Sequence, residues 1–501
     1  MDPKIAWREW DAAAFAEAQA ADKPILLAIG AVWCHWCHVM DATSYRDPGV
    51  IAAIAERYVP VRVDTDRRPD VNARYNLGGW PTTAILTPRG EPLTGGTYVP
   101  PVQLRGLLDE VATAYREHKD EIASAIAERL QRRRDSVPAE RAELGPEIVE
   151  TVFASISERY DEEFGGFGNE QKFPMPDVLE FLLLLSERDR NERIAGMLSK
   201  TLLAMARGGM YDHIEGGFFR YSTTRDWTIP HFEKMAEDHA GLLRSYAGAS
   251  RSLKITPLRE TLVSAVGYVR TIFRDPATGL FAGSQDADEQ YYSLPLEERR
   301  KREAPFVDRT VYAGWSAGLA SGLFAAAQAL EDDAIAADAS TALDALHDRM
   351  RDEAGLLFHY MPHGDAPHVR GLLTDQAQYL RALLDAHEYS GEPRFLDRAA
   401  EHARLVLEKF GPSEGNIGPS RALFDAVPED PLGRLEIPEH PLAENAIVAD
   451  ALLRLSALTG DERLAVRGRE ILESFALNYR SAGMFAAPYS TAVSRALAAS
   501  S

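Results

Sequence analysis

Hydrophobic and polar positions along the first 120 residues form short runs that predict strands separated by helices. The apolar run at residues 24–30 is typical of a buried strand, and the alternation at 58–64 predicts a second one. A glycine turn that leads into a strand is expected at 78–86, and a further strand at 93–98. Helices are predicted at 10–21, 47–57, 67–75 and 101–118. Residues 1–125 therefore form an α/β domain.

The chain changes character after a charged segment at 126–144, which we interpret as a linker. From 145 to 501, helical segments alternate with glycine turns at intervals of roughly fifty to seventy-five residues. The turns contain Gly165-Gly166, Gly216-Gly217, Gly279, Gly355, Gly415 and Gly483. A regular period of helix pairs indicates a stacked or closed array, and six hairpins predict an (α/α)6 toroid. The fold class is multidomain, α/β followed by all-α.

Both cysteines of the chain stand three residues apart, as Cys34 and Cys37, directly after the strand at 24–30. The pair is expected where this strand gives way to a helix. A helix N-terminus favours negative charge, so we expect an exposed Cys34 whose thiolate is stabilised there. Cys37, one turn further in, would resolve a mixed disulfide formed at Cys34.

Three other interpretations of this stretch remain open. Cys34-His35-Trp36-Cys37-His38 matches the C-x-x-C-H pattern of covalent haem attachment, a chemistry that is usually extracytoplasmic. Two Cys and two His within five residues could indicate zinc, but they do not fit comfortably around one tetrahedral ion. The two thiols could also be inert and buried. We expect no cofactor and no metal site.

The dithiol and a later proline together resemble thioredoxins. Trp33-Cys34 and Cys37 are followed by Trp80-Pro81-Thr82, and in thioredoxins this second element carries a cis proline that faces the dithiol. The resemblance implies a thioredoxin-like fold and a cis Trp80–Pro81 bond, which is a minority state of X–Pro bonds. Thioredoxins keep a buried acid six residues before the first cysteine, where this chain has Ala28.

Without that acid, His35 or His38 would have to help to deprotonate the second thiol, or the dithiol would be a weaker reductant. Each histidine could equally be a solvent-facing residue of a first helical turn. The candidate catalytic residues are Cys34, Cys37, Pro81, His35 and His38.

Ordered phrases along most of the chain resemble the family of spermatogenesis-associated protein 20. The phrases are Cys34-His35-Trp36-Cys37-His38-Val39-Met40, Arg68-Pro69-Asp70-Val71, Gly78-Gly79-Trp80-Pro81, Gly95-Gly96-Thr97-Tyr98, Lys172-Phe173-Pro174, Tyr211-Asp212-His213, Gly216-Gly217-Phe218 and Pro230-His231-Phe232-Glu233-Lys234-Met235. The resemblance implies a thioredoxin-like domain joined to a toroid similar to six-hairpin glycosidases and N-acylglucosamine 2-epimerases. In such toroids, loops at one mouth form the binding cleft.

Carboxylates, histidines and aromatic residues gather near two turns of the predicted toroid. The candidate substrate-binding residues are Asp212, His213, His231, Glu233, Asp286 and Asp288. Glycoside cleavage needs two carboxyl groups, and epimerisation needs a general acid and a general base. Acids beside turns also cap helices, a role that Asp375 and Glu444 fit. Asp286 and Asp288 could alternatively hold Ca²⁺ or Mg²⁺ through oxygen ligands.

The net charge and the apolar segments of the chain limit the classes of partner that we expect. The chain has 501 residues and a formal net charge of −21, which argues against nucleic acid and anionic membranes as partners. No apolar segment approaches the length of a membrane span, and residues 1–10 contain no signal-peptide core. We therefore expect a cytoplasmic protein, in which a C-x-x-C pair is more typically catalytic or redox-sensing than structural.

Two functional hypotheses follow. The first is a thiol–disulfide oxidoreductase, whose partner is a thioredoxin-type redox protein or a client protein that the toroid recognises. The second is a glycoside hydrolase or sugar epimerase with a carbohydrate ligand, in which the thioredoxin-like domain is structural or regulatory. A non-enzymatic scaffold is a third interpretation.

Overall fold

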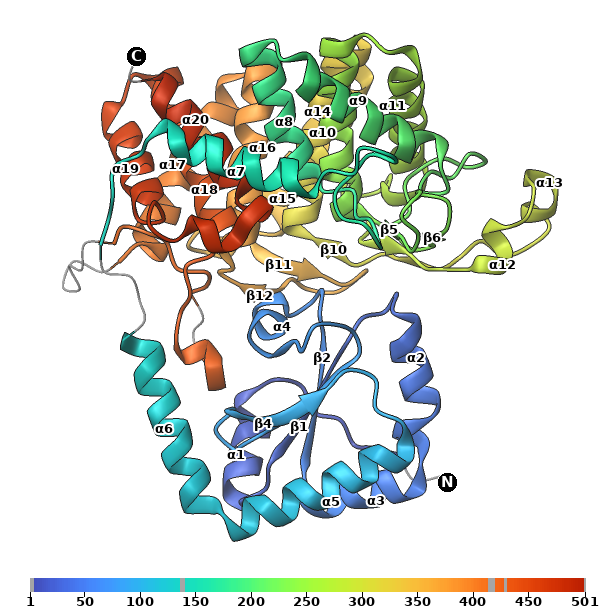
Figure 1. The fold of residues 1–501 in the computed structure, drawn as a ribbon, viewed down its shortest axis with the longest axis vertical. Coiled ribbons are helices and arrows are strands. Elements are labelled where there is room, and N and C mark those ends of the chain that lie inside the picture. The colour runs from blue at the N-terminus through green and yellow to red at the C-terminus, as the bar shows by residue number, and fades with distance from the viewer. Residues whose placement is uncertain (1–3, 136–139, 413–419, 428–429, 500–501) are drawn as a thin grey trace. The chain divides into compact units, whose positions relative to one another are not determined.

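The computed structural model describes residues 4–135, 140–412, 420–427 and 430–499. Contacts divide the chain into two compact units (Figure 1). Unit 1 comprises Met1–Pro138 and Pro428–Pro438, and unit 2 comprises Ala139–Val427 and Glu439–Ser501.

Unit 1 contains a four-stranded sheet of order β2-β1-β3-β4. Its strands are β1 (Ile25–Gly30), β2 (Val59–Asp64), β3 (Thr82–Leu86) and β4 (Pro92–Gly96). β1 pairs in parallel with β2 and antiparallel with β3, and β3 pairs antiparallel with β4. Alternate residues of β1 enter different clusters, Leu27 one and Leu26 the other, which explains why this strand is continuously apolar.

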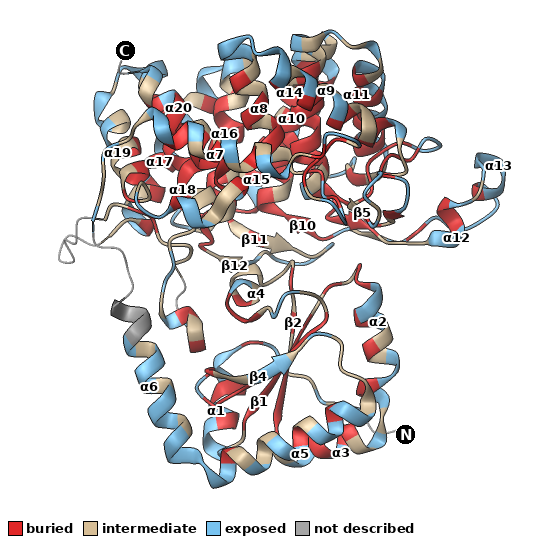
Figure 2. Cartoon of the chain, viewed as in Figure 1, coloured by how far each residue is buried: buried red, intermediate tan, exposed pale blue. Residues whose placement is uncertain are grey.

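Helices cover both faces of this sheet. They are α1 (Ala12–Ala21), α2 (His35–Ala42), α3 (Pro48–Arg57), α4 (Pro69–Tyr75), α5 (Pro101–Glu117) and α6 (Lys119–Asp135), with a 3₁₀ turn at Ser44–Arg46. Asp11 and Asp47 cap α1 and α3 by accepting backbone N–H bonds, as expected for aspartate at a helix start. The predicted element order of this domain is confirmed. In Figure 2, β1 and much of β2 are red and therefore buried, whereas β4 is tan and pale blue.

A short segment from late in the sequence also belongs to unit 1. The 3₁₀ turn η3 (Gly433–Glu436) follows Leu432, and Leu432 and Leu435 pack against the cluster that contains Trp10 and Tyr75. The Tyr75 hydroxyl accepts the backbone N–H of Arg434 at 2.8 Å. The hydrophobic pattern alone placed all of residues 145–501 in the toroid and did not predict this segment.

Unit 2 is a closed ring of helix hairpins in the part of the chain that the structure describes. The inner helices are α8 (Pro176–Asp189), α10 (Ala236–Leu253), α14 (Ala313–Leu330), α16 (Leu373–Ser390), α18 (Leu442–Thr459) and α20 (Ala487–Ala498). Each contacts the next, and α20 contacts α8, which closes the ring. The predicted (α/α)6 toroid is confirmed.

An outer helix packs against each inner one. The outer helices are α9 (Glu192–Arg207), α11 (Thr256–Tyr268), α15 (Asp333–Arg349), α17 (Pro393–Phe410), α19 (Glu462–Glu473) and α7 (Pro146–Arg159). Glycines with positive φ make the tight turns between hairpins, for example Gly165 and Gly166 at φ +71° and +76°. The predicted turn at Gly415 lies outside the described residues.

Short strands and helices connect the hairpins of unit 2. They are β5 (Tyr221–Ser222), β6 (Pro230–His231), β7 (Lys234–Met235), β8 (Ser284–Gln285), α12 (Glu289–Tyr292), α13 (Leu296–Arg299), β9 (Val307–Asp308), β10 (Val311–Tyr312), β11 (Phe358–Met361) and β12 (His368–Arg370). Two further short segments are the π-helical turn η2 (Val269–Phe273) and the 3₁₀ segment η4 (Tyr479–Ala486). Of the six candidate residues of the toroid, His231 lies in β6, whereas the other five lie in the turns and loops beside these elements.

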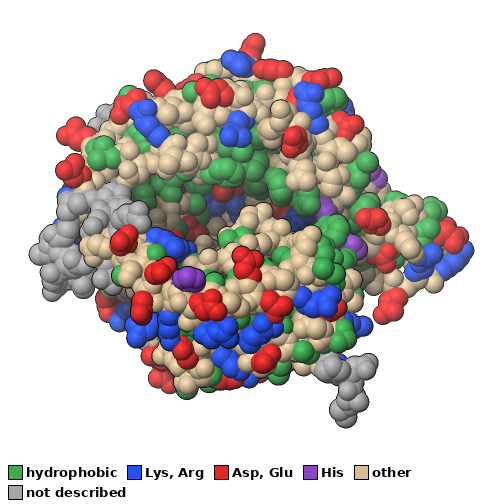
Figure 3. All heavy atoms as spheres, turned by 60° about the horizontal axis from the view of Figure 1, so that its bottom comes forward, with side chains coloured by type: hydrophobic (Ala, Val, Ile, Leu, Met, Phe, Trp, Pro, Cys, Tyr) green, Lys and Arg blue, Asp and Glu red, His purple; other side chains and the backbone are tan. Residues whose placement is uncertain are grey.

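Charged side chains of both signs are interspersed on the face drawn in Figure 3. The excess of acidic residues is therefore not gathered into one patch there. None of the described helices combines the length and apolar character needed to cross a bilayer.

Candidate functional site

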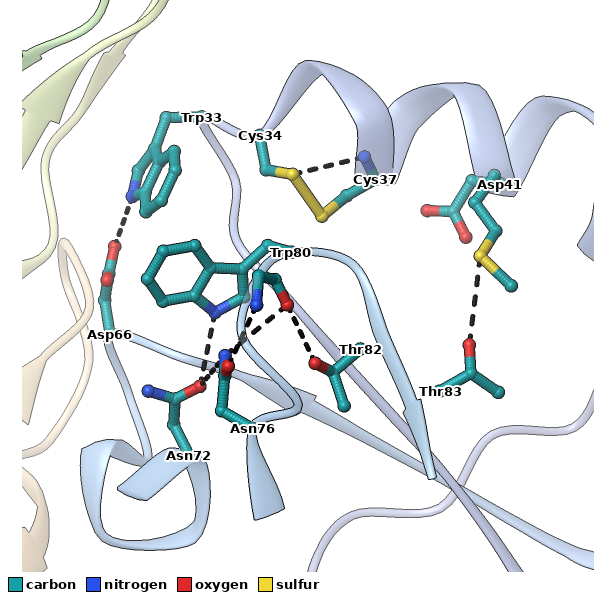
Figure 4. Close-up of a disulfide and its surroundings, with 12 residues drawn as sticks. Trp33, Cys34, Cys37, Asp41, Asp66, Asn72, Asn76, Trp80, Thr82 and Thr83 are labelled. Carbon is teal, nitrogen blue, oxygen red and sulfur yellow. Dashed lines mark hydrogen bonds between the residues drawn. A yellow bond between two sulfur atoms is a disulfide. The ribbon is translucent and has the colours of Figure 1, made fainter. Parts of the chain in front are cut away.

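Cys34 and Cys37 lie where β1 gives way to α2, as the sequence predicts, and they form a disulfide (Figure 4). Cys34 is the N-cap of α2, and its Sγ accepts the backbone N–H of Cys37 at 3.2 Å. A sulfur at this position receives a hydrogen bond and faces the positive end of the helix dipole. The same arrangement would stabilise a thiolate on Cys34 after reduction.

The expectation that Cys34 is exposed is wrong. Cys34 is 6% exposed and Cys37 8% exposed. Aromatic residues explain this burial, since Trp33 and Trp80 lie beside the disulfide in Figure 4 with ring centroids 5.6 Å apart. Each indole is fixed by an acceptor: Trp33 donates to Asp66 at 2.7 Å, and Trp80 donates to Asn72 at 3.2 Å.

The peptide bond between Trp80 and Pro81 is cis, which confirms the prediction. Side-chain hydrogen bonds hold the turn before it. Asn76 Oδ1 accepts the N–H groups of Gly78 and Gly79, and Thr82 Oγ1 donates to the Gly79 carbonyl at 2.8 Å. Pro81 is thereby presented to the dithiol side of the unit.

A cavity of about 330 Å³ lies behind Cys37 in unit 1. Its lining consists of Ala28, Ile29, Gly30, Ala31, Val32, Cys37, His38, Asp41, Tyr45, Arg62, Val63, Asp64 and Pro81. Of the two candidate histidines, His38 reaches this cavity, whereas His35 is exposed and does not line it. Trp36 is 53% exposed next to His35, and His38 is exposed as well, so these three side chains form the accessible edge of the dithiol stretch.

Asp212, a candidate ligand-binding residue of the toroid, lies in a buried ion cluster. Its carboxylate accepts Lys234 Nζ at 2.9 Å and Arg299 Nη1 at 2.8 Å, and Arg299 also donates to Glu215 at 2.8 Å. Burial raises the pKa of Asp212, but the positive charges of Lys234 and Arg299 outweigh it and hold the pKa below its ordinary value. This placement is that of a structural ion pair.

The preceding hairpin repeats the arrangement. Lys172 Nζ donates to Asp161 at 2.6 Å and also to the Gly165 carbonyl, as Lys234 does to Asp212 and the Gly216 carbonyl. Both lysines are fully buried. A geometry that recurs at two turns of the same type indicates a structural role in closing the turn.

The other candidate residues of the toroid are spread over several short elements. His231 forms an ion pair with buried Glu233 and stacks on Tyr221 with centroids 5.0 Å apart. His213 is exposed and lies 3.1 Å from the Gly208 carbonyl. Asp288 caps α12 through the N–H of Tyr291. Asp286 is half-buried and accepts the N–H of Ala287 at 2.8 Å.

A cavity of about 710 Å³ opens in unit 2, and among the described residues its lining includes none of these six candidates. Its ionisable lining residues are Arg159, Asp177, Glu237, Asp238, Arg244, His359 and Asp375, and its aromatic ones are Phe167, Phe173, Trp315 and Phe485. The sequence analysis chose none of these residues as a binding candidate and interpreted Asp375 as a helix cap. Glu237-Asp238, two residues after the phrase that ends at Met235, was the nearest signal.

Two kinds of acid line this cavity. Asp375 is fully buried and accepts His359 Nδ1 at 2.9 Å and the Gly314 N–H at 2.9 Å. Asp177, Glu237 and Asp238 receive no hydrogen bond from any described residue. Burial by the cavity walls raises the pKa of Asp238 to about 7, and Glu237 reinforces the shift. Asp238 is therefore poised to exchange a proton near neutrality.

Within the described ranges, no group of three or more His, Cys, Asp or Glu side chains is placed to hold a metal ion. Asp286 and Asp288 point their carboxylates at backbone N–H groups of their own segment, which does not favour the alternative of a Ca²⁺ or Mg²⁺ site.

Residues 1–133 match the family model described as "Protein of unknown function, DUF255", which is named Thioredox_DsbH. Spermatogenesis-associated protein 20 of Homo sapiens is 34% identical over 335 residues, and that of Rattus norvegicus is 37% identical over 308. The resemblance to spermatogenesis-associated protein 20 is confirmed. The alignments cover 61% and 57% of this chain but only 41% and 39% of the human and rat proteins.

Solved structures similar to this chain share the toroid. The crystal structure of D-mannose isomerase superposes with a TM-score of 0.57 at 11% identity and covers 70% of this chain and 96% of its own. Cellobiose 2-epimerase from Spirochaeta thermophila gives a TM-score of 0.56 at 12% identity with the same coverage. At these identities the likeness shows the fold alone. The chain therefore combines a thioredoxin-like unit with an (α/α)6 toroid.

Proposed function

We propose that this protein is a thiol–disulfide oxidoreductase whose working group is the pair Cys34 and Cys37. The observation that carries the proposal is the disulfide at the start of α2, with the Cys34 sulfur accepting the Cys37 N–H. An N-cap sulfur is the one whose thiolate the helix stabilises, so Cys34 is the nucleophile. The cis Pro81 on the neighbouring turn supports this assignment.

The reaction is a two-electron exchange. The Cys34 thiolate attacks a client disulfide, which forms a mixed disulfide and releases one client thiolate. The Cys37 thiolate then attacks Cys34 Sγ, which closes the intramolecular disulfide and releases the second client thiolate. The client disulfide is reduced and the protein dithiol is oxidised.

A thioredoxin-type redox protein would regenerate the dithiol. The client would enter beside His35 and Trp36, two exposed neighbours of Cys34. A reducing cytosol suits this cycle, because there a C-x-x-C pair is more typically catalytic than structural.

The test is reduction of insulin disulfides by the full chain in the presence of dithiothreitol, together with the redox potential of the dithiol. We expect Cys34→Ser to abolish reduction and Cys37→Ser to accumulate a mixed disulfide. Ser44→Ala, which removes a hydroxyl bonded to the Val99 carbonyl, is a control in the same unit. Activity that survives Cys34→Ser would contradict the proposal.

A second function, carbohydrate binding or conversion in the toroid, is favoured by the cavity of about 710 Å³. Its size falls in the range of small-molecule sites, and it combines aromatic walls such as Trp315 with carboxyl groups. Similar toroids are named D-mannose isomerase and cellobiose 2-epimerase. Asp238, with its pKa of about 7, would be the proton donor of a hydrolase or epimerase.

Calorimetric titration with mannose, glucose and cellobiose tests this second function. We expect binding that Trp315→Ala and Asp238→Asn both weaken, and that His213→Ala leaves unchanged because His213 lies outside the cavity lining. If no sugar binds to the full chain, the carbohydrate function is wrong, and the redox proposal is unaffected.

A further inference from the structure

Resolution of a mixed disulfide at Cys34 requires the Cys37 thiol to lose its proton. Cys37 is 8% exposed, and a Cβ placed on Gly30 would lie 3.3 Å from its Sγ, so the sulfur faces β1. Burial in an apolar setting disfavours the thiolate. The base that receives this proton has to reach the cavity behind Cys37.

Five polar side chains line that cavity: His38, Asp41, Tyr45, Arg62 and Asp64. Burial raises the pKa of Tyr45 to about 12, so it stays protonated, and Arg62 is a permanent cation. Asp64 Oδ1 accepts the N–H groups of Asp66 and Arg67 and thereby holds its own turn. The groups able to accept a proton are His38, Asp41 and Asp64, and of these His38 and Asp41 lie on α2 together with Cys37.

Asp41 is the better placed of these two. It follows Cys37 by four residues on α2, so the two side chains occupy neighbouring positions on one helix face. In Figure 4 the Asp41 carboxylate lies on the same side of the helix as Cys37, one turn further along. His38 is exposed and makes no hydrogen bond with a described residue.

A second residue fixes the orientation of this carboxylate. Arg62 donates to both Asp41 oxygens, one of them at 3.1 Å, and its guanidinium lies 4.4 Å from the centroid of Trp7. Arg62 belongs to β2 and is thus held by the sheet. The carboxylate is therefore oriented at the cavity, and its side chain is still 45% exposed, so a proton that it accepts can pass on to solvent.

We propose that Asp41 accepts the proton of Cys37 across this cavity and that Arg62 positions it. The proposal deepens the redox function and rests on it. A cavity of about 330 Å³ has room for water, whose share of liquid volume is about 30 Å³, so the transfer can pass through one water molecule. The proton moves from Cys37 Sγ to Asp41 and then to solvent, while the thiolate forms the bond to Cys34 Sγ and the client sulfur leaves as a thiolate.

The experiment uses the reduced full chain and dithiobis(nitrobenzoic acid), which reports the two steps separately. Attack by Cys34 releases a first thionitrobenzoate, and attack by Cys37 releases the second. For Asp41→Asn we expect the second phase to slow by about 10–100-fold at neutral pH while the first phase changes less than about twofold. Asp41→Glu, which keeps the carboxylate, should retain the second phase.

A rescue variant sharpens the test. Ala28 lines the same cavity and lies two residues from Gly30, on the same face of β1. Ala28→Asp combined with Asp41→Asn should therefore restore the second phase. Asp109→Asn, which breaks a comparable ion pair with Arg57 outside the cavity, is the matched control and should change neither phase.

The direction in which Asp41→Asn changes the rate of the second phase distinguishes proton transfer to Asp41 from a purely electrostatic effect of its charge. Loss of the Asp41 charge leaves Arg62 without its partner beside Cys37, and an unbalanced cation would lower the thiol pKa and speed the second phase. An unchanged or faster second phase in Asp41→Asn, or a slower one in His38→Ala alone, would overturn the proposal. Failure of the wild-type chain to release a second thionitrobenzoate would instead overturn the redox function itself.

Discussion

The acids at the glycine turns of unit 2 and the acids of its cavity have the same chemistry and opposite surroundings. Asp161 and Asp212 are buried against lysine and arginine at hydrogen-bonding distance. Glu237 and Asp238 face the cavity without such partners, and the pKa of Asp238 is raised whereas that of Asp212 is lowered. The presence or absence of a cationic hydrogen-bond partner thus distinguishes carboxylates that stabilise the fold from those available to a ligand. The residue types near a turn do not make this distinction.

The largest loss of unfolding free energy should come from removing the Asp212 carboxylate. Asp212→Ala would leave Lys234 and Arg299 as buried charges without their carboxylate, which typically costs about 3–5 kcal/mol. Urea unfolding measures the loss. Asp238→Ala is the comparison, because it removes a carboxyl that lacks a partner and should be neutral or stabilising. Equal losses in the two variants would break the distinction between turn acids and cavity acids.

A smaller effect is expected at the equivalent lysine of the preceding hairpin. Lys172→Met removes the bond to Asp161, but Arg225 still donates to that carboxylate at 2.8 Å, so we expect about 1–3 kcal/mol. Thermal unfolding of this variant beside Lys234→Met checks the repeat. A loss at Lys172 that clearly exceeded the loss at Lys234 would show that the two turns are not equivalent.

The two kinds of acid should respond to pH with opposite signs. The lowered pKa of Asp212 contributes stability above its unfolded value of about 3.9, and this stability is lost as pH falls below it. Asp238 has its pKa raised to about 7, so its folded state binds more protons and stability falls as pH rises from about 4 to 7. Asp238→Asn should remove that fall.

The measurement is the difference in unfolding free energy between wild type and Asp238→Asn over this pH range. A difference that stays constant with pH would mean that Asp238 titrates as an ordinary solvated carboxyl.

The smallest change in stability is expected at His213, the exposed candidate residue beside the Gly216-Gly217 turn. Among the described residues its ring contacts the Gly208 carbonyl and the edge of Tyr211, so His213→Ala should change the free energy of unfolding by less than about 0.5 kcal/mol. Sugar titrations of this variant should match wild type. If His213→Ala lost sugar binding, the acids at the glycine turns would again be candidates for the ligand-binding site.

Local signals allowed part of this molecule to be predicted. The pair Cys34 and Cys37 and the cis Pro81 follow from short motifs that fix their own geometry, and the ring of hairpins follows from evenly spaced glycine turns. Burial of Cys34 depends on Trp80, forty-six positions away, and no nearby pattern announces it. The cavity collects Asp238, Trp315 and His359 from three different hairpins, so only ring closure reveals that they meet.

The route of the chain has a practical consequence. After Asp425, whose N–H binds the Glu439 carbonyl at 2.9 Å, the backbone makes an excursion that lends Leu435 to the core of unit 1 and then returns. Gly90 and Gly433 approach so closely there that a methyl group on Gly90 would lie 2.6 Å from the other Cα. If a protease cut the chain between the N-terminal part of unit 1 and unit 2, the fragment that carries Leu435 would still be bound to the core of unit 1. The N-terminal part expressed alone would lack the buried contacts of Leu432 and Leu435.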